Sequence, residues 1–169
     1  MIHSVLGPEQ IDIPVVIGGG IGHGRQLAAI LGMGADGVLI GTRVLVAEEV
    51  WSHAEVKKQI VNSGAADSTL VMSSFRNTSR VINNEFARAV QSLELDGIKD
   101  FDQYWPYVKG ANAFDAYKSG DWNKALLSMG QSAVFADSVQ PMEQIYDTLI
   151  EDSPAALERL RGLRTSKTG

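Results

Sequence analysis

Residues 13–25 read IPVVIGGGIGHGR, and this segment sets the local fold of the chain. The β-branched run 13–17 is typical of a buried strand that ends in a tight glycine loop. From Gly24 apolar side chains recur at helical spacing until the next glycines, and residues 37–40 (GVLI) predict a second buried strand. A strand, a helix of about ten residues and another strand predict a right-handed βαβ unit with parallel strands.

Two glycine-bearing loops follow the predicted strands, one over residues 18–25 and one at residues 41–43. Both leave the carboxyl end of a parallel sheet, where open sheets and barrels bind ligands. Glycine lets the backbone approach a phosphate and leaves N–H groups free to donate to its oxygens, while Thr42 adds a hydroxyl donor. The pattern therefore predicts a phosphate site; the simpler alternative is that the glycines only shape tight turns.

The glycine spacing does not match two common nucleotide motifs. No Gly-Lys-Ser/Thr follows, as a P-loop requires, and the G-x-G-x-x-G match is imperfect, without an acidic partner at the end of the second strand. In barrels the last two strands build the phosphate site with a short extra helix, which residues 44–49 are able to supply. The sequence therefore favours a barrel-type phosphate site.

The chain after Thr42 is mainly helical by prediction. We expect helices over residues 48–62, 78–95 and 112–118, and a short strand over residues 68–73. Further helices are expected after Asp100, from Asp121 to Leu127, over residues 142–150 behind Pro141, and over residues 154–163, followed by a polar tail that frays. No internal repeat or low-complexity segment is visible in the sequence.

Two parallel strands do not form a stable sheet alone, because parallel sheets bury both faces and contain several strands. A complete (β/α)8 barrel needs roughly 200 residues or more, and most of this chain follows the second strand. We therefore predict an α/β fold, a partial TIM (β/α)8 barrel represented by its last two parallel strands, with a mostly helical C-terminal subdomain. The missing strands would come from another chain, or the gene product is truncated or split. The expected divisions are residues 1–62 for the barrel portion, 63–140 for the helical subdomain with its return helix, and 141–169 for the C-terminal helices and tail.

Composition argues against several functional classes. With a formal net charge of −5 and scattered basic residues, the chain has no basic patch for nucleic acid. It has no cysteine, which excludes disulfides and thiolate sites, and its three widely spaced histidines do not suggest a metal site. No apolar run approaches the ~20 residues of a membrane span and no signal peptide is visible, so we expect a cytoplasmic protein.

Several segments beyond the glycine loops carry a family resemblance. They are residues 34–38 (GADGV), 40–43 (IGTR), 47–58, 74–84 (SFRNTSRVINN), 117–122 and 128–131. Together with residues 13–25 they resemble the nitronate monooxygenase family, long called 2-nitropropane dioxygenase, which includes FMN-dependent enoyl reductases. The resemblance covers about residues 11–150 in the right order and implies the C-terminal portion of an FMN-binding barrel.

The resemblance implies roles for six residues. Gly19, Gly20, Gly41 and Thr42 would hold the FMN phosphate, Gly18 stands where the family usually has Ala or Ser, and Gln131 belongs to a Gly-Gln pair near the flavin. The family's catalytic base is a histidine in a glycine-rich segment upstream of the phosphate strands. Only residues 1–12 precede the first strand here, and His3 lacks the surrounding pattern. We therefore assign no catalytic residue and expect the chain to be inactive unless it is complemented.

The resemblance also implies the reaction. In such enzymes FMN takes electrons from an alkyl nitronate and passes them to dioxygen, so a small nitronate and dioxygen are the expected substrates. An enoyl-thioester reductase that uses a reduced nicotinamide is the second interpretation, and a non-catalytic subunit that completes a barrel is the third. A second copy or a complementing chain is accordingly an expected partner. Arg76 and Arg80 are able to meet an anionic substrate, although exposed ion pairs are the default interpretation.

Overall fold

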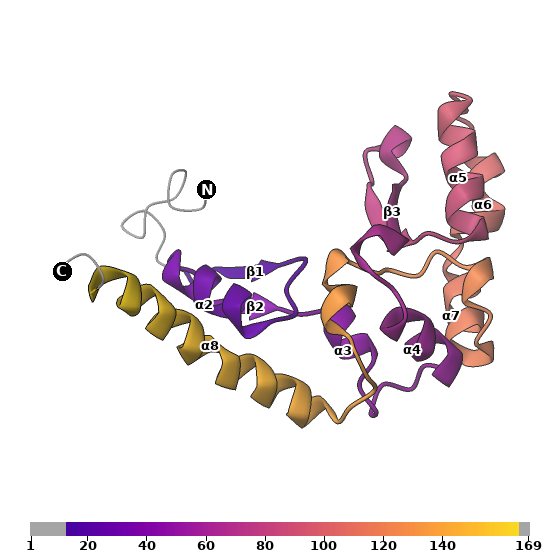
Figure 1. Ribbon diagram of the computed structural model, residues 1–169. Coiled ribbons are helices and arrows are strands. Elements are labelled where there is room, and N and C mark those ends of the chain that lie inside the picture. Colours follow the sequence, from indigo (N-terminus) through magenta and orange to yellow (C-terminus); the bar gives the residue numbers. More distant parts are fainter. Residues whose placement is uncertain (1–12, 166–169) are drawn as a thin grey trace.

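A computed structural model describes residues 13–165 and shows an α/β architecture in which helices predominate (Figure 1). The strands form two separate pairs, β1 (Val16–Gly18) with β2 (Gly37–Leu39) and β3 (Ser68–Val71) with β4 (Ser79–Ile82). The helices are α2 (Gly24–Gly32), α3 (Thr42–Leu45), α4 (Ala54–Val61), α5 (Glu85–Leu95), α6 (Phe101–Val108), α7 (Gly110–Ser119) and α8 (Met142–Thr165). Short 3₁₀ turns are η1 (Ala65–Asp67), η2 (Ser73–Phe75), η3 (Trp122–Lys124) and η4 (Gln131–Phe135).

The predicted βαβ unit is confirmed. Strands β1 and β2 are parallel, with Val16 opposite Gly37 and Gly18 opposite Leu39, and α2 connects them. Helix α2 begins after His23, whose Nδ1 accepts a hydrogen bond of 3.1 Å from the amide of Arg25. This cap satisfies one of the donors that the first turn of a helix leaves free. Both strands end at the same edge of the sheet, as parallel strands must.

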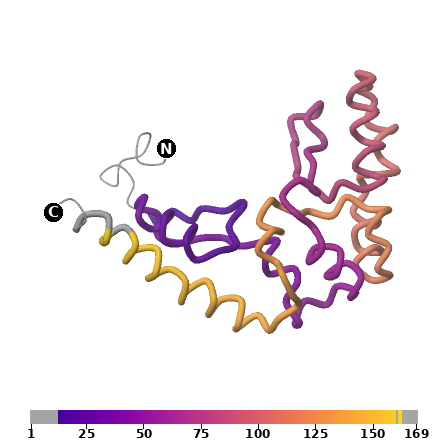
Figure 2. The backbone as a smooth tube through the Cα atoms, viewed as in Figure 1, coloured from indigo at the N-terminus to yellow at the C-terminus, as the bar shows by residue number. Residues whose placement is uncertain are grey.

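The C-terminal helix α8 returns to the N-terminal βαβ unit. Figures 1 and 2 show its yellow ribbon and tube running beside the indigo segment that contains α2. The approach is closest at Gly24, where an added Cβ would lie 2.5 Å from both the Cβ of Asp152 and the carbonyl oxygen of Leu149. Only a residue without a side chain fits at this crossing.

The helix expected over residues 78–95 is wrong in its first part. Residues Ser79–Ile82 form strand β4, antiparallel to β3, and α5 begins only at Glu85 after the cap residue Asn84. The last amide of β4 also donates to the carbonyl oxygen of Leu127 at 2.9 Å, so β4 is paired on both sides. Valine and isoleucine suit a pleated, half-buried strand, and this pairing outweighs their helical spacing.

Other predicted helices differ from the structure at their ends. The helix expected over residues 48–62 begins at Ala54, where His53 caps α4. The helix expected from Asp121 to Leu127 contains only the 3₁₀ turn η3. The helices expected over residues 142–150 and 154–163 are one helix, α8, because it continues through Pro154. The end of the predicted polar tail, residues 166–169, lies outside the described residues.

Three further predicted elements are confirmed, whereas the short extra helix expected over residues 44–49 is instead α3, at Thr42–Leu45. The strand expected over residues 68–73 is β3, and the helix expected over residues 112–118 lies within α7. Asp100 caps α6 as predicted, because its carboxylate accepts from the amide of Asp102 at 3.1 Å.

Two buried apolar clusters hold together the part of the chain from α3 to η4. The first lies among α4, β4, α7 and η4 and includes Val46, Ile60, Ile82, Leu127 and Met129. The second lies among the β3–β4 pair, α5 and α6 and includes Val71, Val81, Val90 and Tyr104. Burial of such side chains is the main source of stability for this region.

One face of the β1–β2 pair is open among the described residues. Val16 and Leu39 are 60% and 68% exposed. Both side chains lie over glycines of the neighbouring strand, since an added Cβ on Gly37 would be 3.7 Å from Val16 and one on Gly18 would be 3.3 Å from Leu39. The alternate residues Ile17 and Val38 are half-buried on the opposite face. The pair thus has one covered and one open apolar face.

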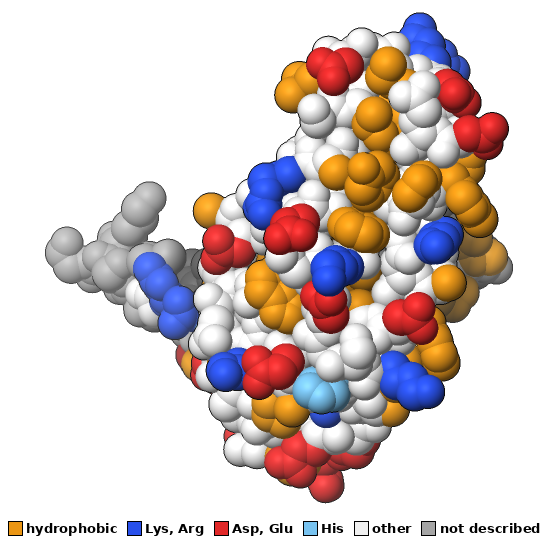
Figure 3. Space-filling view, turned by 90° about the vertical axis from the view of Figure 1, so that its right-hand side faces the viewer, with side chains coloured by type: hydrophobic (Ala, Val, Ile, Leu, Met, Phe, Trp, Pro, Cys, Tyr) orange, Lys and Arg blue, Asp and Glu red, His pale blue; other side chains and the backbone are white. Residues whose placement is uncertain are grey.

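The side of the molecule formed by α5 to α7 also carries apolar groups at its surface. Figure 3 views this side and shows hydrophobic side chains gathered in a band among charged ones. Exposed members of these helices include Leu95, Trp105 and Phe114. Among residues 13–165, no helix combines the length and the apolar character that crossing a bilayer requires.

Candidate phosphate-binding site

The loop after β1 has a backbone that requires glycine. Gly19 and Gly20 have φ angles of +103° and +71°, in the left-handed region that other residues rarely adopt. The side chain of Gln26 fixes the loop: its Nε2 donates to the carbonyl oxygen of Gly20 at 2.7 Å, and its Oε1 accepts from the amides of Gly22 and His23 at 2.9 and 3.1 Å. The amides of Gly20 and Ile21 donate to no group among the described residues. They remain available to a ligand.

The loop after β2 brings a hydroxyl to the same edge of the sheet. Gly41 precedes α3, and Thr42, the first residue of α3, is 8% exposed. The Oγ1 of Thr42 accepts a hydrogen bond of 2.8 Å from the amide of Gly130. Because a hydroxyl has one proton and two lone pairs, this bond uses an acceptor position and leaves the proton of Thr42 free to donate.

Both loops border one cavity of about 390 Å³. An added Cβ on Gly19, Gly20 or Gly41 would meet no atom within 4 Å, so the backbone is unobstructed at all three positions. The cavity is lined by Gly19, Gly20, Ile21, Leu39, Gly41, Thr42, Leu45, Arg80, Tyr117, Ser128, Met129, Gly130 and Ser132. The structure therefore brings together four of the six residues that the resemblance singled out, from two loops separated by a helix.

The other two predicted residues lie beside the cavity rather than on its wall. Gly18 is in β1 against Leu39, one residue before the lining begins. Gln131 is exposed, whereas its neighbours Gly130 and Ser132 line the cavity. The roles assigned to Gly18 and Gln131 stay predictions that this geometry does not favour.

The cavity lining also contains Arg80, which the sequence suggested as able to meet an anionic substrate but did not connect with the glycine loops. Arg80, on β4, is half-buried and is the only charged residue of the lining. Its Nη1 donates to Ser68 through contacts of 3.2 and 3.4 Å, and it forms no ion pair with any described carboxylate. Arg76, its predicted companion, is exposed after η2 and does not line the cavity. No spacing rule connects Arg80 to Thr42, because β4 reaches the cavity only through the tertiary fold.

Two further lining residues come from α7 and η4. Tyr117 on α7 and Ser132 on η4 both contribute hydroxyl groups. Ser132 directly follows the Gly130-Gln131 pair, which was the one signal available in the sequence. Burial raises the pKa of the Tyr117 hydroxyl above its ordinary value, so this group keeps its proton at neutral pH and is able to donate a hydrogen bond.

Arg43 follows Thr42 but turns away from the cavity. Its guanidinium is buried, donates through Nη2 to the Oε1 of Gln140 at 2.8 Å, and lies 3.6 Å from Asp137. Burial lowers the pKa of Arg43, and the nearby Asp137 partly opposes this effect. The side chain ties the segment after η4 to the loop after β2 and is not a ligand candidate.

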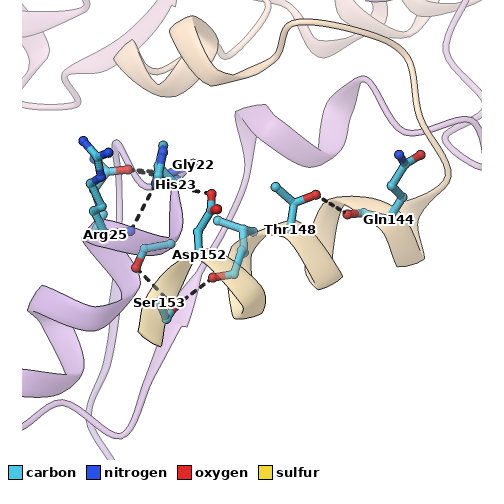
Figure 4. A network of polar contacts seen from close by, with 10 residues as sticks. Gly22, His23, Arg25, Gln144, Thr148, Asp152 and Ser153 are labelled. Atoms are coloured by element: carbon cyan, nitrogen blue, oxygen red, sulfur yellow. Dashed lines mark hydrogen bonds and ion pairs between the residues drawn. The ribbon is translucent and has the colours of Figure 1, made fainter. Parts of the chain in front are cut away.

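Helix α8 fixes the start of α2 through polar contacts, seen in Figure 4. The Ser153 hydroxyl of α8 donates to the carbonyl oxygen of Gly24 at 3.2 Å. The carboxylate of Asp152 lies 3.7 Å from the Nδ1 of His23, but that nitrogen already accepts from the amide of Arg25, so the two side chains share no hydrogen bond. The His23 ring also packs edge-on against Phe135 of η4, with ring centroids 5.5 Å apart. His23, which had no predicted role, therefore holds the first glycine loop in place.

The charges around the cavity suit an anion. No Asp or Glu contributes to its lining, while Arg80 supplies one positive charge. Among the described residues no group of three or more His, Asp or Glu side chains is arranged to bind a metal ion. The arrangement is a set of neutral donors around open space with one cation beside it, a chemistry that suits a phosphate ester.

Comparison with protein families and curated proteins gives a consistent set of relatives. The family model described as nitronate monooxygenase matches residues 3–152. A probable nitronate monooxygenase from Staphylococcus haemolyticus is 31% identical over 90% of this chain and 42% of its own length. A protein of Rhodococcus jostii named (3aS,4S,5R,7aS)-5-hydroxy-7a-methyl-1-oxo-octahydro-1H-indene-4-carboxyl-CoA dehydrogenase is 26% identical over 97% of this chain and 56% of its own length. The chain thus spans about half the length of the curated relatives it matches.

Solved structures resemble the same fold. FabK from Thermotoga maritima matches with a TM-score of 0.82 and 28% identity, over 92% of this chain and 49% of that protein. A nitroalkane oxidase from Streptomyces ansochromogenes matches with a TM-score of 0.68 and 27% identity, over 90% of this chain and 42% of that protein. These similarities confirm the α/β fold class.

Proposed function

Since the chain belongs to the nitronate monooxygenase family, we propose that it forms the FMN-phosphate end of a flavin-dependent oxidoreductase. The observation that carries the proposal is the meeting of two glycine loops and the Thr42 hydroxyl on one cavity without acidic side chains. The proposal includes the finer fold assignment, in which β1 and β2 belong to a (β/α)8 barrel, because the last two strands of such barrels typically build the phosphate site.

The residues present fit the phosphate group of FMN. Gly19, Gly20 and Gly41 leave open the space that a Cβ would fill, so an anion is able to approach their backbone. The amides of Gly20 and Ile21 and the hydroxyl of Thr42 are unused donors. A phosphate dianion accepts hydrogen bonds only, and it requires donors of this kind.

This fit separates the role of FMN from the role of the chain. FMN, when bound, supplies the redox chemistry, accepting and passing on electrons. This chain's residues bind and orient it: the loops hold its phosphate, and Tyr117, Met129 and Arg80 also line the cavity. We propose an alkyl nitronate and dioxygen as the substrates of the whole enzyme, as the family resemblance implies.

A second candidate is an enoyl-thioester reductase that takes electrons from a reduced nicotinamide. It is supported by the Rhodococcus relative, whose name describes a coenzyme A thioester as its substrate. The two candidates differ in the electron donor. Anaerobic mixing of the flavin-loaded protein with NADH or NADPH, and separately with propionate 3-nitronate, distinguishes them by which reagent bleaches the flavin absorbance.

The phosphate assignment is tested by comparing FMN with riboflavin, which has the same ring system but no phosphate. We expect the protein to bind FMN at least about tenfold more tightly than riboflavin, as measured by flavin fluorescence, because hydrogen bonds to a charged group contribute about 1.5–3 kcal/mol. Thr42→Val should reduce this preference and Thr42→Ser should keep it. Thr148→Val, on α8 outside the cavity, is the matched control. Equal affinity of the wild-type protein for both flavins would rule out the proposal.

A further inference from the structure

Ser132 is a buried residue whose hydroxyl has no partner among the described residues. The residue is 3% exposed, and its hydroxyl forms no hydrogen bond with any described residue. Buried polar groups in proteins are nearly always paired, so an unpaired one points to a missing ligand or water. Among the described residues, the only unpaired polar side-chain atom that is fully sealed belongs to Arg43. The Ser132 oxygen is therefore accessible, and it opens onto the cavity that the residue lines.

The position of Ser132 relative to Thr42 is fixed by the glycine between them. The amide of Gly130 donates to Thr42 Oγ1, and an added Cβ on Gly130 would lie 3.4 Å from Thr42 Oγ1 and 3.8 Å from Ser132 Oγ. Both hydroxyl oxygens thus lie within 4 Å of one point. Hydrogen bonds between hydroxyls and anionic oxygens are about 2.7 Å long, so a single tetrahedral anion is able to accept from both.

Ser132 also contacts the first glycine loop. An added Cβ on Gly22 would lie 3.2 Å from the Cβ of Ser132 and 2.9 Å from the ring of Phe135. The start of η4 is therefore packed directly on the loop after β1 and beside the loop after β2. Ser132 stands at the junction of the two glycine loops.

We propose that the Ser132 hydroxyl donates to the same phosphate as Thr42 and is a phosphate-recognition residue of this chain. The inference rests on the proposed function, since it assigns a further donor to that site. It takes the ligand group as a phosphomonoester, because the lining joins neutral donors from three segments and its described residues include no Asp or Glu. The role differs from that of Thr42, which also holds Gly130 in place, because the Ser132 hydroxyl has no structural partner to lose.

The experiment measures FMN and riboflavin affinities of Ser132→Ala by flavin fluorescence, with Ser138→Ala as control. Ser138 lies in the loop after η4, where its hydroxyl contacts Asp137 and not the cavity. We expect Ser132→Ala to weaken FMN about tenfold and to leave riboflavin within about twofold of wild type. Ser138→Ala should change neither.

Thermal unfolding gives a second readout that does not depend on activity. Without flavin, Ser132→Ala should melt within about 2 °C of the wild-type temperature, because the substitution breaks no hydrogen bond to a described residue. With FMN added, the variant should gain less stability than the wild type does, since weaker binding gives a smaller shift. Lower stability of the flavin-free variant would instead assign Ser132 a structural role and overturn the inference.

The outcomes separate the two proposals. If the wild-type protein prefers FMN to riboflavin but Ser132→Ala keeps that preference unchanged, the phosphate site stands and the role of Ser132 is wrong. If the wild-type protein shows no preference, the phosphate site itself is wrong, and the inference about Ser132 fails with it.

Discussion

Tyr117, which lines the cavity, shows how the surroundings of one residue change the pKa of its side chain. Burial raises the pKa of its hydroxyl above the ordinary value of about 10, because the phenolate loses hydration. The folded protein therefore holds this proton more tightly than the unfolded chain does. The resulting contribution to stability is complete below the unfolded pKa and is lost as the pH rises through the folded pKa.

We expect Tyr117→Phe to reduce the loss of stability at alkaline pH. Urea unfolding of the wild type and the variant at about pH 8 and about pH 10.5 measures this effect, since the range brackets the ordinary tyrosine pKa. In a phenolate absorbance titration, the difference between the two proteins should show one group that ionises above about pH 10. A difference curve centred at the value of the urea-unfolded protein would contradict the prediction.

Single residues of the site were predictable only where their signal was local. Gly19, Gly20, Gly41 and Thr42 each follow a strand within a few positions, and a parallel sheet places such loops at one edge. Arg80 and Ser132 reach the cavity through pairings between distant segments, such as the hydrogen bond of 3.2 Å from the amide of Met129 to the carbonyl oxygen of Arg80. No spacing pattern in the sequence encodes such pairings.

At the scale of elements, the crossing of α2 and α8 determines how firmly the first loop is held. Gly24 begins α2 at the point where α8 approaches it, and the contact is to the backbone of Leu149 as well as to Asp152. Backbone atoms in a packed helix do not move aside easily, so a side chain at this position would push the helices apart. The loop after β1 is continuous with this helix start.

Gly24→Ala should destabilise the protein by about 1–3 kcal/mol, the usual cost of overpacking. The matched control is Gly32→Ala at the other end of α2, where an added Cβ meets nothing within 4 Å. The control should change stability by less than about 1 kcal/mol, because alanine suits a helix better than glycine. Chemical unfolding followed by circular dichroism measures both, and equal effects of the two substitutions would refute this account of the crossing.

The predicted boundaries of helices and strands were wrong where hydrogen bonding to a distant segment competes with the local sequence pattern. Val81 and Ile82 fit both a helical stripe and a strand, and the bonds to β3 and to Leu127 decide in favour of the strand. The missed signal was Asn84, whose side chain accepts from the amide of Ala87 as a helix cap. Pro154 misled in the opposite direction, because α8 continues through it. The preceding Ser153 hydroxyl shares its one proton between the carbonyl oxygens of Leu149 at 2.8 Å and Gly24 at 3.2 Å. Anchoring on α2 outweighs the bond that proline removes.

For the whole molecule, the open face of the β1–β2 pair is the main unsatisfied feature of the described residues. A parallel sheet normally buries both faces, yet Val16 and Leu39 are largely exposed. We expect further parallel strands, or another chain, to cover this face in the active protein. This agrees with the partial-barrel interpretation, which stays a proposal, as do the predicted divisions at residues 62 and 140.

The isolated chain should associate weakly through this face. Val16→Lys is expected to reduce association in sedimentation velocity over a concentration series, because a charge there opposes apolar contact. Its effect on stability should stay within about 0.5 kcal/mol, as is usual for exposed positions. Leu95→Lys, an 88% exposed position on α5, is the control that should leave association unchanged. Unaltered association of the Val16→Lys variant would show that the chain does not associate through this face.

The fold class was readable from the sequence because one βαβ unit is encoded by adjacent residues. The position of the helical region relative to that unit was not readable. It depends on contacts such as Thr42 with Gly130 and Arg43 with Gln140, which join residues about 90 positions apart or more. The resemblance to a family supplied the expected ligand, and the geometry then showed which loop residues share a cavity.

The return of α8 to α2 has a consequence for the order in which the protein matures. The glycine loops are translated before the helix that packs on Gly24, which is made only at residues 142–165. During synthesis, residues 18–43 therefore lack their contacts with α8 while the region from α4 to α7 emerges and packs. A nascent chain that is cleaved before residue 142 would therefore keep both glycine loops and lack the helix that packs against the first of them.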